Sequence, residues 1–356
     1  MKIGLIVPGN LWFSPYVSIY TDVLDKLQVE YEVISWNRDG SDKPYGIQYT
    51  NNNQFQGKFH KLLSYLKYIS FLKKTIKEQK YEKLIVFSPQ LSILLYGFLK
   101  KFKKNYIIDY RDLSIEQKPY LMPFFDTILS NSFANVISSP GFKKYLPKSH
   151  QYILSHNFNI NIVRDCIDKP LDNGEWNKAP YRILTIGGIR DYQSNIEVVK
   201  SLANKDSYEI SFVGKGFAAP LIEKYARDNS IENITFEGYY PKEKEGEYIN
   251  NCTFLNIFYP KIKSHSSALS NRFYNALIYR KPMIVTSDST QGDYVDKYNL
   301  GLAIDNCNDL DKKIQEWLNC NNRLDFSNRS TKLLSTFVED YNTFVNTVKQ
   351  FIDKSN

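Results

Sequence analysis

The chain has 356 residues, 42% of them hydrophobic and 24% charged, and its formal net charge is +8. This composition is that of a folded globular protein and excludes a disordered chain and a coiled coil. At this length we expect two domains, each with its own core. The four cysteines are far apart and form no CxxC pair, which excludes a disulfide scaffold and favours reduced thiols in a cytoplasmic protein.

The chain begins with a short apolar run at 3–7, which ends in the turn signal Pro8-Gly9-Asn10. The run is too short for a signal peptide or a membrane span. We therefore expect it to form a buried β-strand.

Strand-length apolar runs alternate with helix-length segments through the first half of the chain. The expected strands are 3–7, 31–36, 83–87, 105–108, 135–138 and 151–154, with helices at 16–27, along a lysine-rich stretch and at 91–99. Strands separated by helices predict a parallel sheet built from βαβ units. Residues 159–180 lose this periodicity and contain several turn signals, which indicates a linker.

The alternation resumes after the linker. The expected strands are 182–186, 208–213, 234–237, 254–259, 283–286 and 301–304, and the expected helices are 194–203, 218–229, 242–250, 270–279, 309–319 and 331–353. Ser194 and Glu197 have the spacing of a capping box at the first of these helices. The predicted organisation is an N-terminal domain (1–160), a linker (161–180), a second domain (181–330) and a C-terminal helix (331–356) that crosses back to the first domain.

The basic charge is concentrated in one segment. Residues 56–105 contain twelve lysines, no arginine and two acidic residues, which gives +10 for the segment and −2 for the rest of the chain. Its apolar residues recur mostly three or four positions apart, as on one face of a helix, with lysine on the other side: Phe59, Leu62, Leu63, Leu66, Ile69, Leu72 and Ile76.

Three interpretations of this segment stay open. The simplest is two helices with solvated lysine faces. The second is a surface that docks on anionic lipid, where each nearby lysine contributes roughly 1 kcal/mol. Nucleic-acid binding is the third, and it is disfavoured because arginine, which does most of the base readout, is absent from the segment.

Ligands of parallel α/β sheets bind beyond the carboxyl ends of the strands, and several features of the second half fall there. Gly187 and Gly188 let the backbone approach a ligand, and Arg190 supplies a cation suited to phosphate. Gly214-Lys215-Gly216 follows the next strand but lacks the strict GxGxxG pattern. Tight turns with surface side chains are the alternative interpretation of both loops.

A third feature begins at His265 and leads into a helix. Ser270 is placed to cap that helix, and Asn271 and Arg272 follow it. A helix N-terminus with unpaired N–H groups and an arginine favours an anion. A capped helix of the core is the alternative.

Taken in order, these segments resemble the donor domain of GT-B glycosyltransferases, close to the family 4 enzymes of bacterial polysaccharide clusters. The resemblance rests on SNRFYNALIYRKPMIVT (270–286), ILTIGGIRDYQSN (183–195), ISFVGKG (210–216) and FEGYYPKEKEGEYINNCTFLNIFY (236–259). In the first half, IIDYRDLS (107–114) and LSHNF (154–158) resemble acceptor-domain segments. The fold implied is GT-B: α/β, with two Rossmann-like domains whose parallel sheets face a central cleft.

The resemblance implies roles for individual residues. Arg190 would bind the donor diphosphate, Gly188 would give a backbone donor, and Asp112 would be an acceptor-side carboxylate. The catalytic candidates are Arg190, Arg272 and Asp112. The donor-binding candidates are Gly9, Asn10, Gly187, Gly188, Arg190, Gly214, Lys215, Gly238, His265, Ser270, Asn271, Arg272 and Asn275.

Two departures from the family pattern concern the donor site. The E-x7-E acids of the family fall on Ser267 and Asn275, and the second of those acids commonly holds the ribose hydroxyls. The lysine that usually follows the phosphate-binding arginine is also missing, although Lys215 or Arg272 could supply its charge.

The resulting expectation is a metal-independent glycosyltransferase of surface-polysaccharide biosynthesis (capsule or lipopolysaccharide), with no cofactor and with UDP-sugar as the first-choice donor. Its expected partners are a lipid-linked or oligosaccharide acceptor and the inner face of the plasma membrane, through the lysine-rich region 58–104, and no nucleic acid. The alternatives are a GT-B sugar-nucleotide epimerase and a GT-B binding protein that has lost catalysis. No HExxH or His/Cys cluster indicates a metal site, and Asp309-Leu-Asp311 falls at a helix start, where acids favour the helix dipole.

Overall fold

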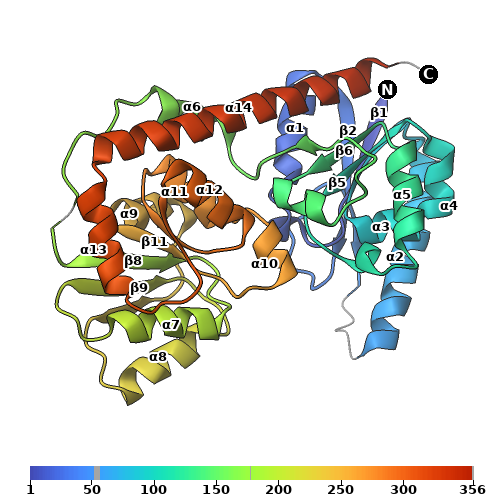
Figure 1. Cartoon of the computed structure of the whole chain (residues 1–356). Coiled ribbons are helices and arrows are strands. Elements are labelled where there is room, and N and C mark those ends of the chain that lie inside the picture. Colours follow the sequence, from blue (N-terminus) through green and yellow to red (C-terminus); the bar gives the residue numbers. More distant parts are fainter. Residues whose placement is uncertain (52–56, 177, 355–356) are drawn as a thin grey trace. The chain divides into compact units, whose positions relative to one another are not determined.

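A computed structural model describes residues 1–51, 57–176 and 178–354. The chain divides into two compact units (Figure 1). Unit 1 comprises residues 1–157 and 340–356, and unit 2 comprises residues 158–339.

Unit 1 is built on a parallel sheet, with seven strands in the described part of the chain, ordered β3-β2-β1-β4-β5-β6-β7. The strands are β1 (Lys2–Ile6), β2 (Glu30–Asn37), β3 (Ile47–Thr50), β4 (Lys83–Phe87), β5 (Tyr106–Tyr110), β6 (Ala134–Ile137) and β7 (Ile153–Leu154). The strand order reverses between β1 and β4, and such a switch point is where open α/β sheets bind ligands.

The helices of unit 1 cover this sheet. They are α1 (Val17–Lys26), α2 (Lys58–Gln79), α3 (Pro89–Leu94), α4 (Tyr96–Leu99) and α5 (Met122–Asn131). Two elements of unit 1 were missed by sequence reasoning, β3 and α5. β3 is a four-residue edge strand whose residues are all partly or fully exposed, so it lacks the apolar signal of a core strand.

Unit 2 is built on a second parallel sheet, with six strands among the described residues, ordered β10-β9-β8-β11-β12-β13. The strands are β8 (Tyr181–Ile186), β9 (Tyr208–Val213), β10 (Ile234–Glu237), β11 (Phe254–Ile257), β12 (Met283–Thr286) and β13 (Gly301–Ile304). The switch point lies between β8 and β11. The fold class predicted from the sequence, α/β with two parallel sheets, is confirmed.

The helices of unit 2 lie on both faces of its sheet. They are α6 (Ile160–Asp168), α7 (Tyr192–Leu202), α8 (Ala219–Asp228), α9 (Glu245–Asn250), α10 (Lys263–Ser267), α11 (Asn271–Ile278), α12 (Thr290–Tyr298) and α13 (Leu310–Cys320). In Figure 1, α7 and α8 lie on one side of the sheet and α11 and α12 on the other. The ends of β8 and β11 are therefore flanked by helices on both faces.

Two local predictions are wrong. The segment 159–180 is not a structureless linker, because α6 begins at Ile160 and buries Val163 and Cys166 in the core of unit 2. Ser194 is not a helix cap either. The helix begins two residues earlier, at Tyr192, and the buried Ser194 hydroxyl has no hydrogen-bond partner in the part of the chain that the structure describes.

The last helix, α14 (Arg323–Asp353), begins eight residues before the predicted start at 331 and contributes to both cores. Its first part buries Phe326 and Phe337 in unit 2, and its last part buries Phe344 and Phe351 in unit 1. Its C-terminal end is capped by a cation from another element. The ammonium of Lys83 is buried and donates to the carbonyl oxygens of Phe351, Ile352 (3.0 Å) and Lys354 (2.8 Å).

The lysine-rich segment differs from the sequence interpretation in two respects. Lys83 is a buried helix cap and not part of a basic surface. In addition, Leu62, Leu63 and Leu66 are exposed, whereas the periodicity placed them on the core face of α2. Ile69, Leu72 and Ile76 are buried as predicted, and Tyr65 and Tyr68 complete the core face of α2. Phe59 belongs to the predicted face, but its side chain lies outside the described residues.

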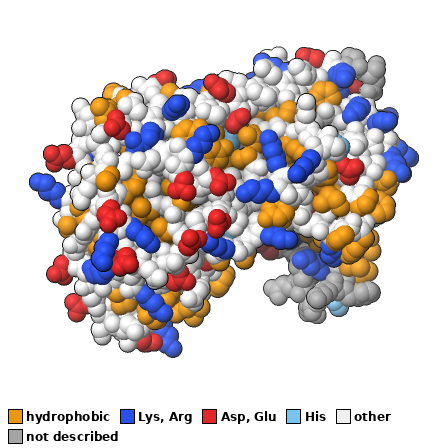
Figure 2. All heavy atoms as spheres, viewed as in Figure 1, with side chains coloured by type: hydrophobic (Ala, Val, Ile, Leu, Met, Phe, Trp, Pro, Cys, Tyr) orange, Lys and Arg blue, Asp and Glu red, His pale blue; other side chains and the backbone are white. Residues whose placement is uncertain are grey.

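The exposed surface of unit 1 combines apolar and basic side chains. Figure 2 shows apolar side chains reaching the surface over α4 and α5, with lysine or arginine nearby. Phe124 is exposed there and packs edge-on against Tyr96, whose ring lies 4.5 Å below the ammonium of Lys100.

Candidate functional site

Two glycine loops lie side by side at the carboxyl edge of the second sheet. Gly187 follows β8 with φ +95°, and Gly214 follows β9 with φ +131°. A Cβ on Gly214 would lie 2.0 Å from the carbonyl oxygen of Gly187, so only glycine fits there. The N–H of Ile189 donates to the carbonyl oxygen of Lys215 at 3.0 Å, which ties the two loops together.

Arg190 extends this edge toward solvent. It is exposed, and no hydrogen bond or ion pair engages its guanidinium in the part of the chain that the structure describes. Gly188 lies beside it, because a Cβ there would be 3.5 Å from the Arg190 Nε. Arg190 is therefore a cation available to an anionic ligand next to a glycine-rich turn.

Arg272 is the second predicted cation, and it is buried in the same place. Its Nε donates to the carbonyl oxygen of Ile186, and its Nη2 donates to that of Gly188 at 2.9 Å. Its guanidinium also lies 5.6 Å from the ring centre of Tyr259. Arg272 thus holds the first glycine loop in place, and its three other N–H donors have no protein partner among the described residues.

The start of α11 is capped as expected. The Ser270 hydroxyl accepts from the N–H of Phe273 at 3.3 Å, and Gln291 accepts from both the N–H and the hydroxyl of Ser270. Asn271 is exposed at the first turn. The cap fixes where α11 begins, and with it the place of Arg272.

His265 lies on α10, after β11. Its ring packs against Tyr259 in a tilted arrangement with the ring centres 5.3 Å apart, and its buried Nδ1 has no hydrogen-bond partner among the described residues. Tyr259 therefore contacts both His265 and Arg272. Lys215 and Gly238 are exposed in neighbouring loops, with the Lys215 ammonium 5.7 Å from the ring centre of Tyr239.

The two positions of the missing acids have different surroundings. Ser267 is buried, and its hydroxyl donates to the carbonyl oxygen of Lys263 within its own helix. Asn275 instead donates from its Nδ2 to a carboxylate, that of Glu245, at 3.1 Å. Glu245 was not predicted from the sequence, because its contact with Asn275 joins α9 to α11 and no sequence pattern predicts a contact between separate helices.

The site candidates of unit 1 make hydrogen bonds or contacts with other residues of unit 1. The Asn10 amide is buried, donates to Asn37 (3.2 Å) and Asp39 (2.6 Å), and accepts from the N–H of Arg38. Gly9 lies next to it, near the Arg38 side chain. Asp112 is exposed, and its carboxylate accepts from the N–H of Leu113 at 2.8 Å.

A buried ion pair lies close to Asp112 in sequence. Asp109 is fully buried, accepts from both Nε and Nη2 of Arg111, and accepts from the hydroxyl of Tyr20 at 2.7 Å. Burial and the Asp109 carboxylate raise the pKa of Tyr20 well above its usual range, so this hydroxyl remains a donor. In the segment 109–112, Asp109 and Arg111 therefore form a buried ion pair that stabilises the fold.

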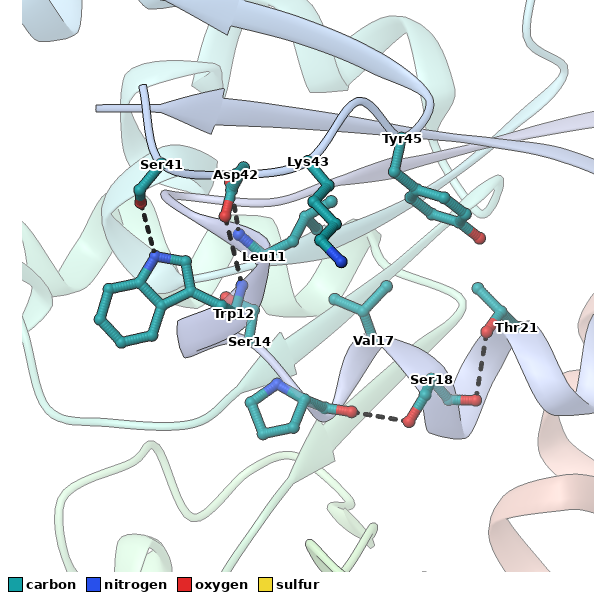
Figure 3. Close-up of a pocket in the computed structure, with 11 residues that line it drawn as sticks. Leu11, Trp12, Ser14, Val17, Ser18, Thr21, Ser41, Asp42, Lys43 and Tyr45 are labelled. Carbon is teal, nitrogen blue, oxygen red and sulfur yellow. Dashed lines mark hydrogen bonds between the residues drawn. The ribbon is translucent and has the colours of Figure 1, made fainter. Parts of the chain in front are cut away.

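Unit 1 also has an apolar pocket of about 760 Å³ between α1 and the loop after β2 (Figure 3). Leu11, Trp12, Val17 and Tyr45 supply its apolar walls. The indole N–H of Trp12 donates to the Ser41 hydroxyl at 3.1 Å. Figure 3 shows Lys43 reaching from the loop toward α1. The charged residues of its lining are Lys43 and Asp42, whose carboxylate accepts from the N–H of Leu11 at 2.8 Å.

Residues 1–51, 57–176 and 178–354 contain neither a cluster of metal-ligating side chains nor a membrane-spanning helix. No three His, Cys, Asp or Glu side chains gather there as ligands for a metal ion. No helix in these ranges has the length and apolar character needed to cross a bilayer.

Similar proteins were found among solved structures. No family model matches the sequence, and no curated protein matches it. Anabaena HepE, solved in complex with UDP, is 11% identical, covering 98% of this chain and 100% of that chain with a TM-score of 0.68. The lipopolysaccharide outer core galactosyltransferase WaaB is 16% identical, covering 99% of both chains with a TM-score of 0.64.

A third similar structure is that of a protein with a different activity. A putative UDP-N-acetylglucosamine 2-epimerase from Listeria monocytogenes is 12% identical, covering 100% of this chain and 98% of that chain with a TM-score of 0.64. At these identities the similarity concerns the fold. The two parallel sheets and this full-length similarity together agree with the sequence resemblance: the chain has the GT-B glycosyltransferase fold.

Proposed function

We propose that this protein transfers a sugar from a UDP-sugar to a lipid-linked saccharide acceptor in surface-polysaccharide biosynthesis, at the inner face of the plasma membrane. The observation that carries the proposal is the exposed guanidinium of Arg190, which pairs with no described residue and lies beside Gly187 and Gly188 at the switch point of the second sheet. Ligands of α/β sheets bind at this point. The HepE structure with UDP supports the choice of base.

The chemistry that this edge supports is stabilisation of a departing nucleoside diphosphate. Glycosyl transfer leaves negative charge on the diphosphate while the sugar carbon becomes electron-poor. Arg190 and the remaining N–H donors of Arg272 are placed to receive that charge, and fixed donors of this kind are usually the largest catalytic contribution. In this proposal arginines offset the charge in place of a metal ion, so transfer is expected to persist in EDTA.

The acceptor side of the proposal rests on unit 1. The pocket beside Trp12 has apolar walls for part of a lipid carrier, and Lys43 offers a cation for its phosphate. The exposed leucines of α2, with Lys61 and Lys67 beside them, provide an apolar and basic surface for anionic lipid. Both features favour an acceptor that is presented by a membrane.

The first experiment is a thermal-shift panel of nucleoside diphosphates and nucleotide-sugars. A bound nucleotide raises the melting temperature by mass action. We expect UDP and one UDP-sugar to raise it and Arg190→Ala to abolish the rise. No shift with any nucleotide would overturn the proposed donor site. A positive donor is then incubated with membrane lipid extract, and sugar transfer to lipid is measured.

A sugar-nucleotide epimerase is the second candidate, because an epimerase is among the similar structures. It would convert the sugar of UDP-sugar without any acceptor and without releasing UDP. A GT-B protein that has lost catalysis would bind UDP-sugar and leave it unchanged. Product analysis with and without lipid extract separates all three functions.

A further inference from the structure

A carboxylate from α9 lies against the side chain at one of the missing acid positions. Glu245 is the first residue of α9, and one carboxylate oxygen accepts from the Tyr240 hydroxyl at 2.9 Å. The other oxygen accepts from the Asn275 amide at 3.1 Å and pairs with Lys242. The Glu245 side chain is 14% exposed, so the carboxylate is held in place and still reaches the surface.

The close packing of α9 on α11 sets this contact. A Cβ on Gly246 would lie 2.5 Å from the Tyr279 hydroxyl, so any larger residue there would displace the Tyr279 side chain. Tyr279 follows Asn275 by four residues, one helical turn. With Gly246 facing Tyr279, the preceding residue, Glu245, faces Asn275.

The carboxylate retains capacity for a ligand. A carboxylate offers about four acceptor positions, of which Tyr240 and Asn275 take two. The third partner, Lys242, is 74% exposed, and an ion pair with such an exposed side chain holds weakly. A ligand hydroxyl can therefore take the place of the Lys242 ammonium.

Glu245 also lies near the glycine loop that follows β8. The Tyr240 hydroxyl that holds it lies 3.8 Å from where a Cβ on Gly187 would be. On α11, Arg272 precedes Asn275 by three residues and binds the carbonyl of Gly188. The same short helix thus orients the glycine loop with one side chain and Glu245 with the next on that face.

We propose that Glu245 accepts hydrogen bonds from the ribose hydroxyls of the donor nucleotide, with Asn275 and Tyr240 as positioning residues. This assignment rests on the proposed function. In this assignment the carboxylate that binds the ribose belongs to α9, whereas the family resemblance places it on α11. The Asn275 amide, which occupies the former acid position, orients the new one.

The test compares two probes that differ only in the ribose, UDP and 2′,3′-dideoxyuridine 5′-diphosphate, by calorimetric titration. A hydrogen bond to a charged group strengthens binding by about tenfold or more. We therefore expect Glu245→Gln to weaken UDP binding about tenfold and to leave the dideoxy probe unchanged. Glu247→Gln, which removes the same charge from an exposed position of the same helix, is the matched control and is expected to change neither.

The outcomes separate this assignment from the proposed function. If the unsubstituted protein does not bind UDP, the proposed function fails and the ribose assignment fails with it. If it binds UDP and Glu245→Gln weakens both probes equally, or neither, the assignment alone is overturned. Should Glu245→Gln not fold, Asn275→Ala decides in the same way: a loss confined to UDP supports the assignment, and an equal loss or no loss overturns it.

Discussion

The guanidinium of Arg272 donates a 2.9 Å hydrogen bond to the carbonyl oxygen of Gly188, which lies 84 residues earlier in the chain. A second donation, to Ile186, comes from the same group. These bonds join α11 to the end of β8 across the switch point of the sheet. One buried side chain therefore connects the helix that resembles a donor-site helix to the loop that resembles a phosphate loop.

Arg272→Gln is expected to destabilise unit 2. The shorter amide cannot reach both carbonyls, and a buried acceptor without a partner costs about 1–3 kcal/mol. We expect the free energy of unfolding to fall by about 2 kcal/mol in urea titration, with a lower melting temperature when no nucleotide is present. Arg227→Gln, an exposed arginine of α8, is the control. Equal stability of the two variants would contradict a positioning role for Arg272.

Arg190→Ala is expected to weaken UDP binding and to leave the stability of the nucleotide-free protein unchanged. Its side chain is exposed and makes no hydrogen bond or ion pair with any described residue, so the melting temperature of the nucleotide-free protein should not change. The guanidinium–phosphate contact is expected to contribute at least about tenfold to UDP affinity. Calorimetric titration with UDP checks this, with Arg227→Ala as the control. Unchanged affinity would remove Arg190 from the donor site.

The sheet of unit 2 follows closely from its sequence. The strands 208–213, 234–237, 283–286 and 301–304 have the predicted bounds, because each is a short apolar run next to turn residues. Elements with a mixed pattern were not foreseen. α6 lies in a region rich in turn signals, and its core contacts come from residues distant in sequence.

The candidate site was less accessible to sequence reasoning. Arg272 was expected as a cation at a helix start, and it lies there, but its bonds to Ile186 and Gly188 depend on how α11 packs against β8. Asn275 was recorded as a missing acid. The carboxylate beside it, Glu245, belongs to another helix, and only the folded chain brings the two together.

The exposed leucines of α2 are expected to bind lipid. Burying a leucine in the membrane interface contributes up to about 1.5–3 kcal/mol. We expect the double variant Leu62→Ser with Leu66→Ser to bind vesicles containing phosphatidylglycerol at least about tenfold more weakly, measured by co-sedimentation. Leu221→Ser with Leu324→Ser, two leucines of similar exposure in unit 2, is the matched control.

The dependence of vesicle binding on salt concentration also tests the lipid-binding surface of α2. Because lysines contribute through screened charge, binding of the unsubstituted protein should weaken as salt increases, and vesicles of phosphatidylcholine alone should bind less. Equal sedimentation of the two double variants would contradict the assignment of α2 as the lipid-facing helix.

Trp12 is expected to bind the lipid portion of the acceptor. The residue is 58% exposed and forms part of the pocket beside α1. Trp12→Ala should weaken binding of farnesyl phosphate, a short mimic of a lipid carrier, by about tenfold in calorimetric titration, because a large apolar wall is lost. UDP affinity should not change. Tyr120→Ala, an exposed aromatic outside the pocket, is the control, and equal effects of the two variants would count against the pocket.

The buried His156 is expected to make the folded protein less stable in acid. Its side chain is fully buried, and its Nε2 lies 2.9 Å from the Asp340 carboxylate, close to where α14 enters unit 1. Burial lowers the pKa of His156, the nearby Arg111 charge lowers it further, and the Asp340 carboxylate offsets part of the shift. The neutral imidazole is therefore favoured in the folded protein.

The sign of the effect follows from proton binding. The unfolded chain binds a proton at His156 near pH 6.5, whereas the folded chain binds it at a lower pH. Between these two values the unfolded state holds more protons, so the free energy of unfolding falls as the pH falls below about 6.5. Each unit of difference between the two pKa values corresponds to about 1.4 kcal/mol.

Urea titrations between about pH 7.5 and 5 measure this slope. His156→Gln keeps a hydrogen-bonding side chain at the position and removes the titration, so the decline of stability toward acid should become shallower than in the unsubstituted protein. His60→Gln, at an exposed position of α2, is the control and should keep the original slope. A stability that rises toward acid in the unsubstituted protein and flattens in His156→Gln would show that the Asp340 pair, and not burial, dominates the titration of His156.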